Sequence, residues 1–182
     1  MVKYPLGIQN KKRTVTHKNR GMSLESLINK TNLYYLENDI AVVYKKPTPI
    51  KIIKVNNSEN TIKSAVFSKH STTDYNGIYN GKYLDFEAKS TNSKTSFPIK
   101  NFQDCQLDHF HRIIKQKGLA FVIFYFNELD EYYFLTVDWL FNCLKNNEKS
   151  SIPLSFIKEK GFKIPLTLNP PLDYIKIVDM FF

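Results

Sequence analysis

An Asn-Gly pair between two alternating segments is the feature that most constrains the fold of this chain. Asn80 and Gly81 separate "DYNGIY" from "KYLDFEAK", and both residues tolerate the positive φ angles of a type I′ turn. The pair therefore predicts a two-residue β-hairpin in which Tyr79 lies opposite Lys82. Counting outward from this turn fixes the register of the other residues in the two strands.

The predicted register brings two acidic side chains together. Asp74 is expected opposite Glu87, and one step of the pleat further Thr72 is expected opposite Lys89, all four on one face of the hairpin. The other face is apolar and consists of Leu84, Phe86 and Ala88. Directly opposed residues hold their Cβ atoms about 4.5–5.5 Å apart, and like charges at that separation destabilise a sheet. The closeness of the two acids therefore needs a reason.

A divalent cation bridging Asp74 and Glu87 is one explanation. Hard oxygen ligands suit Mg²⁺ or Mn²⁺ rather than zinc. Lys89 would then lie where it can hold an attacking water or neutralise charge growing on a phosphate. The alternative is a solvated sheet face on which Lys89 simply relieves the repulsion, and the register by itself is compatible with both explanations.

A second helix is expected over "NFQDCQLDHFHRIIKQKG", with Gly118 as its end. At the helical period Gln106 lies on the apolar face, between Phe102, Phe110 and Ile113. An inward amide needs partners, because leaving one unsatisfied costs about 1–3 kcal/mol. Gln106 therefore either supplies an oxygen near a metal or its bound water, or is a core glutamine bonded to the backbone.

The rest of the chain alternates between helical and strand patterns. The other expected elements are a helix over about 24–37 capped by Ser23, strands over 40–46 and 49–55, a protruding polar loop over 56–64, a buried strand over 119–126, a strand leading into a helix over 131–145, and a final strand over 173–182. This order predicts an α/β fold with a mixed sheet flanked by helices. A length of 182 residues fits one domain over 21–182.

The basic charge of the chain is concentrated at its start. The net charge is +9, and residues 1–20 contain no acid. The basic residues of this segment are Lys3, Lys11, Lys12, Arg13, Lys18 and Arg20. A flexible basic arm of this kind is usually drawn to nucleic acid, which makes Lys11, Lys12, Arg13, Lys18 and Arg20 candidate DNA contacts. The alternative is a solvated tail that aids solubility.

Nothing in the sequence indicates a membrane or secretory protein. The start lacks the apolar core of a signal peptide, and the longest apolar run, "LAFVIFYF", is too short to span a bilayer. Cys105 and Cys143 do not form a CxxC motif or a disulfide framework. A soluble, cytoplasmic protein is expected.

Several stretches together resemble one nuclease family. The order acid, about a dozen residues, then acid-x-Lys is the loose pattern of the PD-(D/E)xK nuclease superfamily, and here it is Asp74 followed by Glu87-Ala88-Lys89. More specific stretches resemble the RecU family of Holliday-junction resolvases: "NRGMSLES" (19–26), "KKPTPIKIIKV" (45–55), "STTDYNGIYNGKYLDFEAKSTNSKTSFPIKNF" (71–102) and "PLDYIKIVD" (171–179). The resemblance runs from about Lys3 to the last residues, with a short and less distinctive N-terminal arm.

The resemblance implies a site, a fold and an assembly. It places a Mg²⁺ site, in which Mn²⁺ can substitute, on Thr72, Asp74, Glu87 and Gln106. It makes Asp74, Glu87 and Lys89 the catalytic residues, with Lys89 stabilising the transition state. It also implies a homodimer and a restriction-endonuclease-like fold, in which a stalk over about 55–69 enters the centre of the junction.

The function implied is that of a structure-selective endonuclease acting in homologous recombination and DNA repair. Its substrate would be four-way junction DNA, nicked symmetrically in the nucleoid, and its protein partners would include a recombinase and a branch-migration helicase. Two alternatives remain open from the sequence: a repair or restriction-type nuclease of the same fold, and a non-catalytic junction-binding recombination factor.

Overall fold

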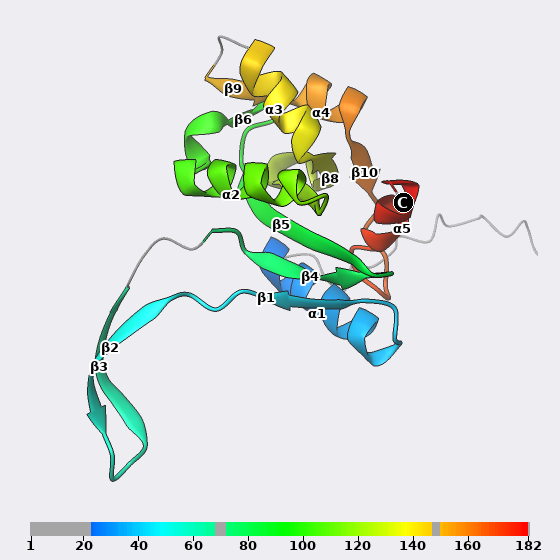
Figure 1. Ribbon diagram of the computed structural model, residues 1–182. Coiled ribbons are helices and arrows are strands. Elements are labelled where there is room, and N and C mark those ends of the chain that lie inside the picture. The colour runs from blue at the N-terminus through cyan, green and yellow to red at the C-terminus, as the bar shows by residue number, and fades with distance from the viewer. Residues whose placement is uncertain (1–22, 68–71, 147–149, 182) are drawn as a thin grey trace, which may run out of the picture.

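A six-stranded mixed sheet lies at the centre of the molecule (Figure 1). The computed structural model describes residues 23–67, 72–146 and 150–181. The strands follow the order β1 (Val42–Lys45), β4 (Tyr75–Tyr79), β5 (Lys82–Thr91), β7 (Leu119–Phe126), β8 (Glu131–Thr136) and β10 (Phe162–Ile164). Neighbouring strands are antiparallel except β5 and β7, which are parallel. The expected mixed sheet flanked by helices is confirmed.

Helices cover both faces of this sheet. Helix α1 (Leu24–Glu37) and the short C-terminal helix α5 (Ile175–Val178) enclose one core, whereas α2 (Asp104–Lys115), α3 (Val137–Asn146) and α4 (Leu154–Lys160) enclose a second core on the other face (Figure 1). The remaining elements are β6 (Ser96–Pro98), which pairs with β9 (Ser151–Pro153), and the 3₁₀ turns η1 (Ile99–Asn101), η2 (Asn127–Leu129) and η3 (Asp179–Phe181). None of the helices in the described ranges is long and apolar enough to cross a membrane.

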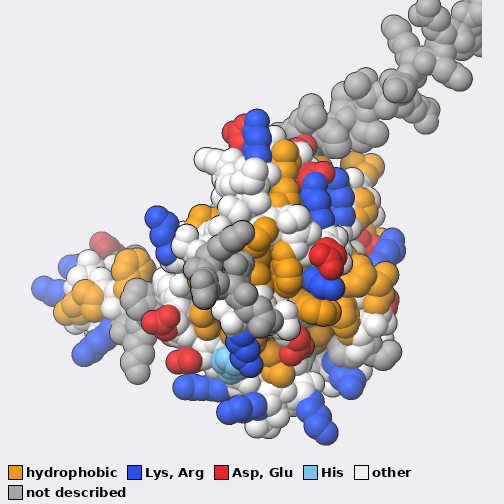
Figure 2. Space-filling view, turned by 90° about the horizontal axis from the view of Figure 1, so that it is seen from above, with side chains coloured by type: hydrophobic (Ala, Val, Ile, Leu, Met, Phe, Trp, Pro, Cys, Tyr) orange, Lys and Arg blue, Asp and Glu red, His pale blue; other side chains and the backbone are white. Residues whose placement is uncertain are grey.

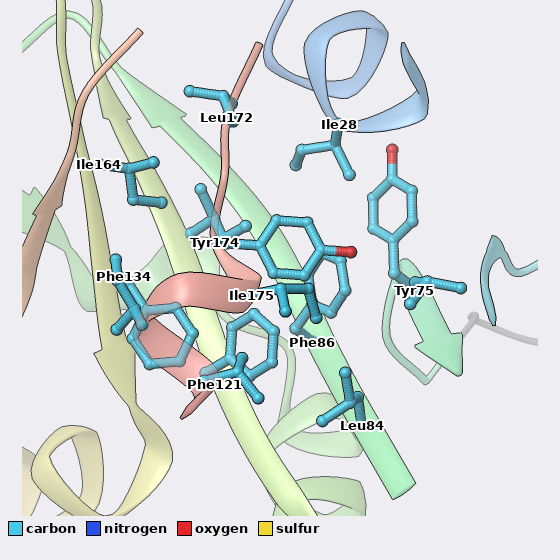
Figure 3. Packing of buried hydrophobic residues seen from close by; sticks show 14 of the residues in the cluster. Ile28, Tyr75, Leu84, Phe86, Phe121, Phe134, Ile164, Leu172, Tyr174 and Ile175 are labelled. Atoms are coloured by element: carbon cyan, nitrogen blue, oxygen red, sulfur yellow. The ribbon is translucent and has the colours of Figure 1, made fainter. Parts of the chain in front are cut away.

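A row of stacked aromatic rings runs across four neighbouring strands (Figure 3). The ring centroids of Tyr75 and Phe86 are 4.8 Å apart, those of Phe86 and Phe121 4.6 Å, and those of Phe121 and Phe134 4.3 Å. Tyr174, which lies just before α5, packs against Phe86 at 5.2 Å. Because side chains alternate along a strand, this row places Asp85, Glu87 and Lys89 of β5 on the opposite face of the sheet.

A long hairpin projects from the body of the molecule. Within the described ranges, strands β2 (Ile50–Asn56) and β3 (Thr61–Phe67) pair only with each other (Figure 1). This stalk hairpin exposes hydrophobic and basic side chains side by side (Figure 2), and Phe67 is 81% exposed. The expected polar loop over 56–64 is therefore only partly right, because its second half belongs to β3.

The expected C-terminal strand is wrong. Residues Ile175–Val178 form helix α5 and Asp179–Phe181 form a 3₁₀ turn. The alternation of Ile175, Lys176 and Ile177 suggested a strand, but Val178 is buried as well. The apolar side chains of this segment pack on the face of the sheet rather than beside a strand, and short apolar runs of this kind do not distinguish the two structures.

The second helix also ends earlier than expected. Helix α2 stops at Lys115, and Lys117, with φ of 61°, adopts the left-handed conformation that commonly follows a helix. Gly118 instead allows close packing, because a Cβ atom there would lie 2.8 Å from Cγ2 of Ile113.

Strand β1 approaches β4 so closely that position 77 excludes a side chain. A Cβ atom at Gly77 would lie 2.2 Å from the carbonyl oxygen of Val42 and 2.7 Å from Cα of Val43. We expect Gly77→Ala to lower the free energy of unfolding by about 3 kcal/mol, because backbone must move to admit the methyl group. Urea denaturation measures this loss.

Gly81→Ala is the matched control for this substitution. Its added methyl group meets no atom within 4 Å, so only the left-handed φ of 75° opposes it. The expected cost is about 1 kcal/mol. Equal losses for the two variants would contradict the close approach of β1 and β4.

Candidate active site

The hairpin of β4 and β5 has the register that the Asn-Gly pair predicts. Tyr79 pairs with Lys82, and the pairing continues to Tyr75 opposite Phe86. Asn80 and Gly81 have φ angles of 46° and 75°, as a type I′ turn requires. The turn therefore determines that Glu87 of β5 lies beside the residue that precedes β4, which is Asp74.

Asp74 and Glu87 lie next to each other at that end of the sheet. The backbone N–H of Asp74 donates to Oε2 of Glu87 at 3.1 Å, and the N–H of Ala88 donates to Oδ2 of Asp74 at 3.0 Å. Each carboxylate thus binds the backbone of the facing segment, in place of further sheet pairing. The expected pairing of Thr72 with Lys89 is wrong, because β4 begins at Tyr75.

Glu87, Lys89 and Gln106 form a bonded triangle beside Asp74. Nζ of Lys89 lies 2.7 Å from Oε1 of Glu87, and Nε2 of Gln106 donates to the same oxygen at 2.6 Å. Lys89 also donates to Oε1 of Gln106 at 3.1 Å, and this oxygen accepts the backbone N–H of Gln103, which caps α2. Gln106 is buried, as its place on the apolar helix face predicted. It bonds both the backbone and the candidate site.

The charged face of β5 is buried. Glu87 is 2% exposed and Asp85 is fully buried, because helix α2 lies over this part of the strand and contacts it through Gln106 and His109. The solvated sheet face considered from the sequence is therefore wrong. Two acids at adjacent inward positions require neutralising partners in the interior.

The surroundings of Glu87 favour its uncharged form. Burial, followed by the charge of Asp74, raises the pKa of Glu87 from 4.5 to about 7, although Lys89 and Gln106 act in the opposite direction. One lysine therefore does not balance the two acids. A further cation at this position would offset the repulsion between the two acids and favour the ionised form of Glu87.

The donor set at this position fits a hard divalent cation. Asp74 and Glu87 offer carboxylate oxygens from adjacent segments, which is the chemistry that Mg²⁺ and Mn²⁺ prefer. Gln106 presents its amide nitrogen to Glu87 and its carbonyl to Lys89. Thr72 points toward Lys46, whose Nζ lies 3.4 Å from its hydroxyl. In the part of the chain that the structure describes, no three His, Cys, Asp or Glu residues are grouped to hold a metal.

A second polar cluster, not anticipated from the sequence, surrounds Asp85. Its Oδ2 lies 2.7 Å from Nζ of Lys46 and 3.0 Å from Nε2 of His109, and accepts the hydroxyl of Tyr83 at 3.0 Å. The hydroxyl of Thr73 donates to Oδ1. The available signal was that Asp85 shares the inward side of β5 with Glu87.

The basic arm lies outside the described residues. This holds for each candidate DNA contact, namely Lys11, Lys12, Arg13, Lys18 and Arg20. Their contribution to binding stays a prediction.

Comparison with known proteins identifies the family. The model of the RecU family, Recombination protein U, matches residues 19–180. The chain belongs to the RecU family. The matched residues include the stalk hairpin and the candidate site residues from Thr72 to Gln106.

Relatives within the RecU family match over nearly the whole chain. A protein of Lactobacillus acidophilus named Holliday junction resolvase RecU is 43% identical over 100% of this chain and 97% of its own length. The protein of the same name from Bacillus subtilis is 45% identical over 99% of this chain and 90% of its own length. Among solved structures, Archaeoglobus fulgidus Hjc, a Holliday junction resolvase, covers 72% of this chain and 88% of its own, at 14% identity and a TM-score of 0.44.

The raised pKa of Glu87 makes stability depend on pH. In the absence of divalent ions, the stabilisation from its protonated form is complete below pH 4.5 and is lost as the pH rises through 7. We therefore expect Glu87→Gln to be more stable than the unaltered protein in EDTA at pH 8, by on the order of 1–3 kcal/mol. The difference should vanish near the acid end of this window, and thermal unfolding at several pH values measures it.

Glu159→Gln is the control, because Glu159 is an exposed acid on α4 paired with Lys160. It should behave like the unaltered protein at every pH. A Glu87→Gln variant that is less stable than the unaltered protein at pH 8 would show that the ionised form of Glu87 does not destabilise the fold in the absence of a metal.

Proposed function

We propose that this RecU-family protein is a structure-selective endonuclease that cuts four-way DNA junctions by metal-dependent hydrolysis of phosphodiester bonds. The observation that carries the proposal is the pair of adjacent carboxylates, Asp74 and Glu87, with Lys89 bonded to the second. Relatives that match this chain from end to end are named Holliday junction resolvases, which favours a junction as the substrate over linear DNA.

Asp74 and Glu87 would hold Mg²⁺, or Mn²⁺ in its place, with further oxygens from Thr72 and Gln106. A divalent ion bound there supplies charge that polarises the phosphate and lowers the pKa of a water molecule. Both acids must be ionised for this, and the ion's own charge favours that state. The excess of negative charge in the described site therefore serves the binding of the ion.

Lys89 would orient the attacking water and offset negative charge on the phosphate in the transition state. Its ammonium group is held by Glu87 and Gln106, and its side chain is 14% exposed. A donor fixed in advance costs little reorganisation when charge develops. In-line attack would leave a 5′-phosphate and a 3′-hydroxyl.

A junction has two equivalent strands to cut, so a symmetric homodimer with one site in each subunit matches its symmetry. In this proposal the stalk hairpin enters the centre of the junction and the basic arm binds backbone phosphates. Shape rather than base sequence would then select the substrate. The place of action would be the nucleoid, beside a recombinase and a branch-migration helicase.

Removing the chemistry should leave recognition intact. We expect Asp74→Ala and Lys89→Ala to reduce cleavage of a mobile four-way junction in Mg²⁺ by about 10³-fold or more, because each removes a group acting on the reacting atoms. Junction affinity, measured by gel shift in Ca²⁺, should stay within about a factor of three. Lys163→Ala, which removes an exposed lysine paired with Glu131 on β8, is the control.

The same assay separates the alternatives. A linear duplex of the same sequence should be cut far more slowly than the junction. Equal rates would favour a repair nuclease of the same fold, and a protein that binds junctions without nicking them in Mg²⁺ or Mn²⁺ would be a non-catalytic recombination factor.

The arm should contribute through charge alone. Replacing Lys11, Lys12 and Arg13 with alanine should reduce the slope of log affinity against log salt by about 2–3, since each phosphate contact adds roughly 0.9 on duplex DNA. The cleavage rate at saturating protein should not change. An unaltered slope would mean that the arm is a solvated tail.

A further inference from the structure

The two ends of the stalk hairpin meet at one buried carboxylate. Lys46 follows β1 and leads into β2, while Thr73 precedes β4, on the side of the hairpin where the chain returns to the sheet. Asp85 of β5 contacts both: its Oδ2 lies 2.7 Å from Nζ of Lys46, and its Oδ1 accepts the hydroxyl of Thr73. Nζ of Lys46 and the Thr73 hydroxyl are themselves 2.5 Å apart, which closes a triangle.

The same lysine also contacts the segment of the candidate metal site. Its backbone N–H donates to the carbonyl oxygen of Asp74 at 2.7 Å. Its Nζ lies 3.4 Å from the hydroxyl of Thr72. Lys46 thus contacts three consecutive residues, Thr72 to Asp74, through its backbone and its side chain.

Most of the cluster is shielded from solvent. Asp85 is fully buried and the side chain of Lys46 is 16% exposed. His109 and Tyr83 complete the acceptor capacity of Asp85. The ammonium group of Lys46 is surrounded by protein oxygens and by His109, 3.4 Å away. A charge held this tightly has a fixed position, so Lys46 suits a positioning role better than a role in binding DNA phosphates.

We propose that Lys46 and Asp85 form a positioning pair, which fastens both ends of the stalk hairpin to β5 and thereby holds Asp74 against Glu87. The inference rests on the proposed function, since it assigns a task to residues beside the proposed metal site. Asp85 lies two positions before Glu87 on the same strand face. A junction gripped by the stalk is therefore placed in a fixed relation to the carboxylates that act on it.

Displacing the Thr72–Asp74 segment should impair the chemical step rather than binding. Partners that orient metal ligands typically contribute 10- to 100-fold to metal affinity or activity, and a shift of about 1 Å can cost 10²-fold in rate. Loss of the pair should therefore lower the rate at saturation and weaken metal binding, while junction affinity is retained.

The experiment compares Lys46→Met, Asp85→Asn and the double variant with Lys163→Met, which makes the same substitution in the exposed ion pair with Glu131. We expect both single variants to cut a saturating four-way junction about 10- to 100-fold more slowly in Mg²⁺. Calorimetric titration with Mn²⁺ alone should show affinity weaker by about 10-fold. Junction affinity in Ca²⁺ should match that of the control.

The double variant tests whether the two residues act as a unit. If they do, its rate should be no lower than that of the slower single variant, because partners in one interaction are not additive. A double variant whose loss of rate equals the product of the two single losses would overturn the proposal. Variants that match Lys163→Met in both rate and Mn²⁺ affinity would overturn it as well. Weaker junction binding at an unchanged rate would also overturn it, since Lys46 would then be a DNA contact.

Removing one partner of a buried pair leaves an unpaired charge and can unfold a protein. Thr73→Val is the milder variant, because it keeps the ion pair and removes one of the contacts that link it to the Thr72–Asp74 segment. We expect it to slow cleavage by about 3- to 10-fold with unchanged junction affinity. If the unaltered protein does not cut junctions, the proposed function fails; if it does and Thr73→Val cuts equally fast, only the positioning role fails.

Discussion

The stacking of aromatic rings across β4, β5, β7 and β8 is the constraint on which the rest of the structure depends. Tyr75, Phe86 and Phe121 occupy directly paired positions of three strands and bury their rings against one another. A slip of one residue would turn these rings to the other face and bring Asp85 and Glu87 into their place. The apolar packing of one face therefore determines where the charges of the other face lie, and the turn at Asn80 and Gly81 gives the same register independently.

The two acids of β5 are neutralised to different extents. Asp85 bonds four side chains, of which Lys46 is a cation, and these satisfy it completely. Glu87 has one lysine, Lys89, but shares its surroundings with a second acid, Asp74. Helix α2 contacts both positions, through His109 and Gln106. The charge of Asp85 is thus balanced by its partners within the protein. The pair of Asp74 and Glu87 instead has an excess of negative charge, which suits a cation.

Local signals in the sequence predicted the parts of the fold that depend on neighbouring residues. The Ser23 cap of α1, the register of the hairpin and the inward position of Gln106 all follow from short-range rules, and all are confirmed. The pleat of β5 placed Asp85 on the same face as Glu87, but its full burial could not be predicted, because burial depends on where α2 packs over the sheet. The helical turn at Ile175–Val178 was missed because tertiary packing, rather than its alternation, decides its structure. Strand β3 of the stalk hairpin has no buried face, so its sequence does not show the alternation of apolar and polar residues that predicts a strand.

The stalk hairpin has no core of its own, since every residue of β3 and nearly every residue of β2 is exposed. An isolated two-stranded ribbon is only marginally stable in water. Substitutions in the hairpin should therefore have little effect on the free energy of folding of the rest of the protein. Selection for stability then constrains these positions only weakly. The hairpin can therefore tolerate changes in length and surface chemistry while the carboxylate end of the sheet keeps its geometry, which separates the surface of the stalk from the proposed active site.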